Sequence, residues 1–360
     1  MASRFQKKTA PKLPSIRGTT PSLFNFQLLT STGIPGLDYL VGGGFPIGTV
    51  CLLENNTDSS SKSNLACESG QNYAQLIVQY FMAEGAFFAH KLFLGKNVLD
   101  NVQIPAIVQS DAVKTESQST NEQMKIAWRY ENQSPSKEEI GNQENRSHHF
   151  NLNKTVPASE LASILSTWNL TSQLAENNAY VDLFKTISYT CADFKIQPGS
   201  PPTNVLRIGL FDLGHTLFYE GIDNNETQLL TFLYRLRSLA RTHFVVILAC
   251  LSADFHARHH YGGPVHQQVL ELVDTSIALT SFDKEERTKG AFKEHHGIIE
   301  LTKASPLNSL QNASNVHSVK VKHLFKSLRT KFSISPMHLP PDMGQEEEQE
   351  KSKSIRSLDF

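Results

Sequence analysis

The sequence segment with the clearest chemistry is an incomplete phosphate-binding loop at residues 56–63. The loop frame GxxxxGK[ST] needs two glycines so that backbone N–H groups can wrap phosphates, a lysine for the terminal phosphates and a hydroxyl for Mg²⁺. Lys62 and Ser63 occupy the last two positions, but Asn56 and Ser61 stand where the glycines belong. A Cβ at those positions opposes the turn that the loop requires. We therefore interpret the segment as a polar surface loop. A working loop that uses Lys62 and Ser63 is the alternative.

A third candidate for nucleotide binding is Asp212. It follows the apolar segment Leu206–Phe211, where a carboxylate could hold Mg²⁺ through water, although an acid at the end of a strand is also common without this role. The acid that would polarise an attacking water is missing after the second predicted strand, because none occurs between Leu92 and Leu99. We therefore expect no catalytic residue, no cofactor, no metal site and no enzymatic activity.

Strands that alternate with helices must position these residues. Short apolar runs predict strands at 49–54, 91–94, 124–130, 206–213, 244–251, 276–280 and 297–301. Helical spacing predicts helices at 73–84 (capped by Gly85), 157–168, 180–187, 226–241 and 265–272. Alternation of this kind is typical of an α/β fold with a mostly parallel central sheet flanked by helices.

Composition and charge divide the 360 residues into one large domain with two charged ends. Residues 1–26 are predicted to be a basic disordered arm, with structure beginning near Leu28, and 343–360 a disordered charged tail. The domain, 27–342, would carry polar insertions near 55–72, 96–123 and 131–155. The longest apolar run, Phe244–Leu251, is too short for a membrane span. Four cysteines without a CxxC pair indicate reduced, mostly buried thiols.

Two basic clusters are candidates for RNA or subunit contacts. The net charge is −1, so any nucleic-acid contact must be local. One cluster lies on the predicted helix 226–241 and comprises Arg235, Arg237 and Arg241; the other is a predicted helix-plus-strand surface that comprises Lys320, Lys322, Lys326, Arg329 and Lys331. For both clusters, an ordinary solvated surface is the alternative.

Two resemblances place these features in known families. The pattern TGIPxLDxLxGGGxPxG at residues 32–48, followed by a buried strand, resembles the opening of RecA/KaiC-type ATPase domains. Six further segments occur in the order seen in the Elongator complex protein 4 family: Met124–Tyr130, Leu206–Gly209, Phe232–Arg237, Arg241–Thr242, His296–Gly297 and Leu339–Asp342. The sequence departs from that family around residues 55–72, where its loop is longer.

The second resemblance implies a RecA-like P-loop-type fold with degenerate Walker motifs. It also implies a non-catalytic accessory subunit of Elongator that acts in tRNA wobble-uridine (U34) modification, in the cytoplasm and nucleus. The implied partners are Elongator proteins 5 and 6 in a hetero-hexameric ring that binds tRNA, and the catalytic Elongator subcomplex, without a membrane. The alternatives are an active RecA/KaiC-type ATPase acting on DNA and a structural ring member without RNA contact.

Overall fold

The computed structural model describes most of the domain that the sequence predicts. It covers residues 16–22, 26–56, 73–97, 103–107, 148–170, 178–197, 202–219, 225–259, 261–282, 293–305, 321–328 and 331–337. None of the helices in these ranges is both long and apolar enough to cross a membrane.

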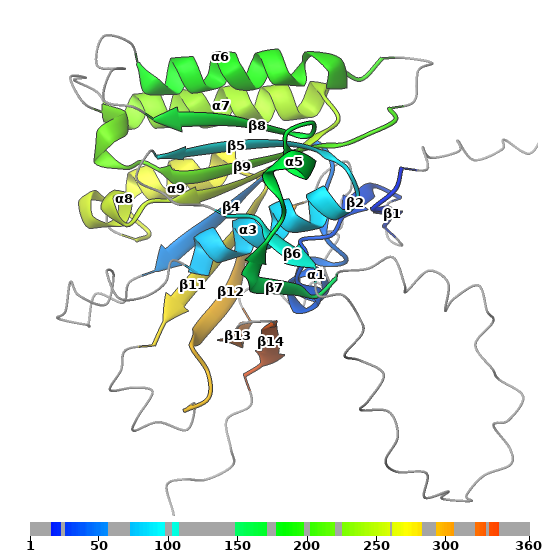
Figure 1. Cartoon of the computed structure of the whole chain (residues 1–360). Coiled ribbons are helices and arrows are strands. Elements are labelled where there is room, and N and C mark those ends of the chain that lie inside the picture. The colour runs from blue at the N-terminus through cyan, green and yellow to red at the C-terminus, as the bar shows by residue number, and fades with distance from the viewer. Residues whose placement is uncertain are drawn as a thin grey trace, which may run out of the picture.

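A nine-stranded mixed sheet forms the centre of the fold (Figure 1). In chain order its strands are β4 (Thr49–Asn56), β5 (Lys91–Asn97), β8 (Leu165–Leu170), β9 (Leu206–Leu213), β10 (Val245–Leu251), β11 (Thr275–Ser281), β12 (Gly297–Lys303), β13 (Lys322–Ser327) and β14 (Phe332–Pro336). Their spatial order is β14-β13-β12-β11-β4-β10-β9-β5-β8. Neighbours from β11 to β8 pair in parallel, whereas β12, β13 and β14 extend the sheet by antiparallel pairing.

Helices cover both faces of this sheet. The main ones are α3 (Tyr73–Phe87), α6 (Ala179–Cys191), α7 (Asn225–Thr242) and α9 (Pro264–Leu272); the shorter ones are α1 (Pro35–Val41), α5 (Ala158–Leu161), α8 (Ala253–Arg258) and the 3₁₀ turns η3 (Ala192–Phe194) and η4 (Thr216–Tyr219). Alternate residues of β10 enter different cores: Val246 and Leu248 join the core of α1 and α3, while Ile247 joins that of α6, α7 and α9. Burial on both faces explains why this strand is apolar throughout.

Two small sheets attach to the main one. β1 (Thr19–Pro21), β2 (Leu28–Thr30) and β3 (Phe45–Pro46) form one, and β6 (Pro105–Ile107) pairs with β7 (Phe150–Thr155) in the other. Gly44 allows the first sheet to form, because its φ is +124° and a Cβ there would lie 2.4 Å from the Thr30 carbonyl oxygen.

The α/β class and the helix-flanked sheet are confirmed, and most predicted elements are present with small shifts of their ends. The bounds of β9 match the prediction, and the free thiols of Cys51, Cys191 and Cys250 are buried as predicted. The predicted strand 124–130 lies outside the described residues, as does Cys67.

The predicted helix at 157–168 is wrong. Helix α5 covers only Ala158–Leu161, and β8 begins at Leu165. Trp168 and Leu170 are buried while Asn169 between them is exposed, which is the two-residue period of a strand. Parallel pairing with β5 therefore overrides a local pattern that also suited a helix.

Other boundaries also differ from the predictions. Helix α3 continues past Gly85, which is not a cap, and β1 shows that structure begins before Leu28. The polar insertions contribute β6, β7 and the ends of β4 and β5. The surface predicted as helix plus strand is instead the β13–β14 hairpin where it is described.

Candidate functional site

The predicted nucleotide site lies at the carboxyl edge of the parallel strands. Strand β4 ends at Asn56 and helix α3 begins at Tyr73, so Lys62 and Ser63 lie outside the described residues. Asp212 is described, in β9, with a φ of +50°. Nε2 of Gln75 in α3 donates to Oδ2 of Asp212 over 3.1 Å. The fold therefore brings Asp212 to the first turn of the helix that follows the predicted loop.

The described part of this edge carries little catalytic chemistry. Strand β5 ends in Gly95, Lys96 and Asn97, none of which is acidic. Across the described ranges, no three His, Cys, Asp or Glu side chains cluster closely enough to hold a metal ion. What the described residues show beside the start of α3 is the Asp212 carboxylate, which accepts a hydrogen bond from the Gln75 amide.

A buried carboxylate that the sequence reading missed lies in β4. Glu54 is fully buried and accepts hydrogen bonds from Oγ of Ser276 and Nε2 of His266. Nδ1 of His266 accepts the N–H of Gly262 over 3.1 Å. Since both ring nitrogens and both carboxylate oxygens have partners, this group ties β4 to β11 and α9. The only sequence signal was an acid at the end of an apolar run.

A second missed group surrounds Arg207, a fully buried residue of β9. Its Nη1 donates to the carbonyl oxygens of Ser31 and Phe81 over 2.8 and 2.9 Å, and its Nε donates to Nδ1 of His90 over 3.0 Å. The guanidinium carbon lies 4.7 Å from the centre of the Phe81 ring. Burial lowers the pKa of Arg207 to about 10, so the group remains charged at neutral pH.

Two buried carboxyl groups lie near this guanidinium. Asp38 accepts hydrogen bonds from Oγ of Ser31 and the N–H of Thr32 over 2.6 and 2.7 Å, and burial raises its pKa to about 6. Glu84 of α3 is fully buried and accepts the N–H of His148 over 3.3 Å. This Arg207 cluster joins β9, α3 and the N-terminal segment. Its sequence signal was an arginine inside an apolar strand.

The structure brings two of the three predicted arginines of α7 to one carboxylate and places the third elsewhere. Arg241 donates to the Asp274 carboxylate and to the Gly48 carbonyl. Arg237 lies 3.6 Å from the Asp274 carboxylate and donates to the Glu271 carbonyl over 3.0 Å. Arg235 is exposed and lies over the ring of Phe184. Arg237 and Arg241 therefore hold α7 to neighbouring elements, while Arg235 faces solvent.

The predicted lysine cluster lies mainly on the β13–β14 hairpin, residues 322–336, which we call the basic hairpin. Lys322 and Lys331 are exposed. Nζ of Lys326 donates to the Glu294 carboxylate over 2.9 Å, and this contact lowers the pKa of Glu294. Lys320 and Arg329 lie outside the described residues. The fold therefore presents cations along one edge of the sheet.

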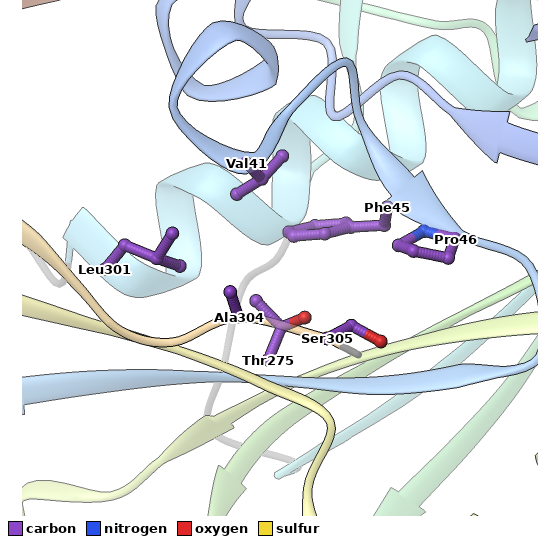
Figure 2. A pocket seen from close by; sticks show the side chains of 7 residues that line it. All are labelled: Val41, Phe45, Pro46, Thr275, Leu301, Ala304 and Ser305. Atoms are coloured by element: carbon purple, nitrogen blue, oxygen red, sulfur yellow. The ribbon is translucent and has the colours of Figure 1, made fainter. Parts of the chain in front are cut away.

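A cavity between α1, β3 and β12 is unsuited to a nucleotide. Figure 2 shows its lining side chains: Val41, Phe45, Pro46, Thr275, Leu301, Ala304 and Ser305. The cavity of about 10 Å³ has room for about one water molecule. Oγ of Ser305 is buried there without a hydrogen-bond partner among the described residues.

Comparison with known proteins links this arrangement to one group. The model of a family described as PAXNEB protein matches residues 12–359. A Danio rerio relative is 32% identical over 95% of this chain and 89% of its own length. A Mus musculus relative is 32% identical over 95% of this chain and 86% of its own length. A Schizosaccharomyces pombe relative is 22% identical over 99% of this chain and 99% of its own length. All three are called Elongator complex protein 4.

Proposed function

The chain belongs to the PAXNEB protein family, and from this premise we propose that it is an accessory subunit of the Elongator complex. The observation that carries the proposal is the correspondence with proteins called Elongator complex protein 4 over nearly their whole length. The correspondence extends over 89% of the Danio rerio relative and 86% of the Mus musculus relative, so it is not confined to a single motif.

The proposed role is in tRNA wobble-uridine (U34) modification, as a RecA-like member of a hetero-hexameric ring with Elongator proteins 5 and 6. The approach of Asp212 to the first turn of α3 supports a RecA-like architecture, since a P-loop fold needs this placement. The missing loop glycines support a role without catalysis, which leaves the chemistry to the catalytic subcomplex. The proposed locations are the cytoplasm and the nucleus.

The proposed contact with tRNA is electrostatic and centred on the basic hairpin. Lys322 and Lys331 are exposed there, and among the described residues neither has an ion-pair partner. Neutralising phosphates releases counterions, so each contact adds about 0.7–0.9 to the slope of log affinity against log salt. The arginines bonded to Asp274 are less available for phosphate.

Co-purification tests membership of the complex. The tagged full chain, expressed in cells, is expected to retrieve the RecA-like and catalytic Elongator subunits, identified by mass spectrometry. Cells without the chain are expected to lose modification at U34 and to regain it when the chain is restored. Retrieval of none of these subunits, or normal U34 modification without the chain, would contradict the proposal.

A salt series tests the tRNA contact separately. The assembled ring carrying Lys322→Glu and Lys331→Glu is expected to bind tRNA more weakly and with a shallower salt slope than the wild-type ring. The matched control is Lys185→Glu with Lys195→Glu, two exposed lysines of α6 and the segment after it. If all three rings bind tRNA with equal affinity and equal salt slope, the proposed contact on the hairpin would be contradicted, and the partner subunits would have to provide the tRNA surface.

The second candidate function is an active RecA/KaiC-type ATPase acting on DNA. Lys62, Ser63 and the position of Asp212 favour it, because each matches one part of a nucleotide site. The purified full chain decides between the two functions: ATP hydrolysis that disappears in Lys62→Ala would establish the ATPase. We expect no hydrolysis in either protein.

A further inference from the structure

The basic hairpin has a potential competitor for its phosphate ligands within the same chain. The acidic residues Glu346, Glu347, Glu348 and Glu350 follow the end of β14 closely in sequence. We propose that this acidic run docks on the basic hairpin and competes with RNA phosphates for Lys322 and Lys331. The competition rests on the proposed tRNA binding, whereas the docking does not.

The position of β14 brings the acidic run within reach. β14 is an edge strand next to β13 (Figure 1). Its last residue, Pro336, pairs with His323, which follows Lys322 in β13. Glu346 is ten positions after Pro336, and ten residue-to-residue steps span at most about 33–36 Å. The five-residue strand is about 17 Å long. The acidic run can therefore reach either end of the hairpin without any change in the sheet.

Charge complementarity favours this surface. The Glu294 carboxylate already accepts a hydrogen bond from Lys326, which shows that the hairpin holds a carboxylate in this fold. Lys322 and Lys331 offer two further ammonium groups on the same hairpin. A covalently attached partner also has a high effective concentration, on the order of millimolar. Individually weak surface pairs can then compete with RNA.

The consequence is an electrostatic threshold for RNA binding. Occupied by the acidic run, the hairpin presents less positive charge, and a polyanion must displace the run before it binds. Exposed ion pairs are individually weak, so two of them reduce RNA affinity by only about 2- to 20-fold. Salt screens this competition, because the Debye length falls from about 10 Å at 0.1 M to about 3 Å at 1 M.

Zero-length cross-linking tests the docking in the assembled complex. A carbodiimide joins a glutamate to a lysine as an amide with loss of water, and mass spectrometry identifies the linked peptides. We expect links from the acidic run to Lys322 and Lys331, lost in about 0.5 M salt. The matched control lysine is Lys185 of α6, which packs near β5 and β8 at the opposite side of the sheet. Links to Lys185 as frequent as those to Lys322, or no links to the hairpin, would overturn the inference.

Charge removal tests the competition. The ring carrying Glu347→Gln and Glu348→Gln is expected to bind tRNA about 2- to 20-fold more tightly at low salt, with the gain vanishing at high salt. The control is Glu160→Gln with Glu226→Gln, which removes the same charge from two exposed residues of α5 and α7. Equal gains in both variants would overturn the competition. Hairpin links without any tRNA binding would instead contradict the proposed function and leave the docking intact.

Discussion

The Nε atom of Arg207 donates a 3.0 Å hydrogen bond to Nδ1 of His90, and both side chains are buried. Because Nδ1 accepts this bond, the ring proton lies on Nε2, which is 2.8 Å from the carbonyl oxygen of Arg17. One neutral imidazole thus connects strand β9 to the segment before β1. The first strands of the chain therefore depend on a charged group in the centre of the sheet.

Replacing Arg207 is expected to destabilise the fold strongly. Arg207→Met keeps much of the side-chain volume but leaves the buried carboxyl groups of Asp38 and Glu84 without the nearby positive charge. Removing one partner from a buried charge group typically costs about 3–5 kcal/mol. Urea unfolding of the full chain, followed by circular dichroism, measures the loss against Lys185→Met, an exposed change on α6. Equal stability of the two variants would contradict this role for the Arg207 cluster.

The His90–Arg207 contact predicts a particular pH dependence. Burial and the Arg207 charge lower the pKa of His90 from 6.5 to about 3. Between about pH 3 and pH 6.5, the unfolded chain therefore carries a proton on His90 that the folded chain does not. The stability that neutral His90 contributes above pH 6.5 is lost as the pH falls towards 3. The expected loss is about 1.4 kcal/mol per pH unit. Asp38, whose pKa is raised to about 6, has the opposite effect and loses its contribution as the pH rises through 6.

Comparison with His90→Gln isolates the histidine, because Asp38 is present in both proteins. Glutamine retains a donor and an acceptor but does not titrate. We expect the advantage of the wild-type chain in the free energy of unfolding to shrink steadily from pH 6 to pH 4. A constant difference across this range would show that His90 does not stay neutral in the folded chain.

Gly85→Ala is expected to destabilise the chain although it lies within a helix. On an isolated helix this change is stabilising by about 1 kcal/mol. Here the added Cβ would lie 2.7 Å from Cδ of Arg207 and 2.7 Å from Cδ2 of Leu92. Overpacking of this kind costs about 1–3 kcal/mol. Thermal unfolding of Gly85→Ala should therefore have a lower midpoint temperature than that of the wild-type chain. Ser238→Ala, on the exposed face of α7, should leave this midpoint unchanged.

The arginines of α7 are expected to differ in their effect on stability. Arg241→Ala removes a donor from the buried Asp274 carboxylate, which also accepts the N–H of Val50 over 2.9 Å. The expected loss is about 1–3 kcal/mol. Arg235→Ala should change the free energy of unfolding by about 1 kcal/mol or less, because Arg235 is exposed. A double-mutant cycle between Arg241 and Asp274 should give a coupling energy different from zero. If the two single substitutions have additive effects on the free energy of unfolding, that result would contradict an interaction between these residues.

Local sequence determined the elements that are buried on both faces. The apolar runs that became β9 and β10 predict strands because each contacts a core on both sides of the sheet. The long amphipathic helix α7 was equally clear, since its apolar residues repeat on one face. The sequence also showed that the loop carrying Lys62 lacks both glycines of a phosphate-binding frame.

Only the tertiary structure decided which polar residues became partners. Ser276 meets Glu54, and Arg241 meets Asp274, through strand order and helix packing that no local pattern encodes. Trp168 lies in a strand because β5 offers an edge for pairing, although its neighbours also suited a helix. The spacing of apolar residues indicates which side of a helix or strand is buried. Which polar residues become partners depends instead on which distant elements pack against that side.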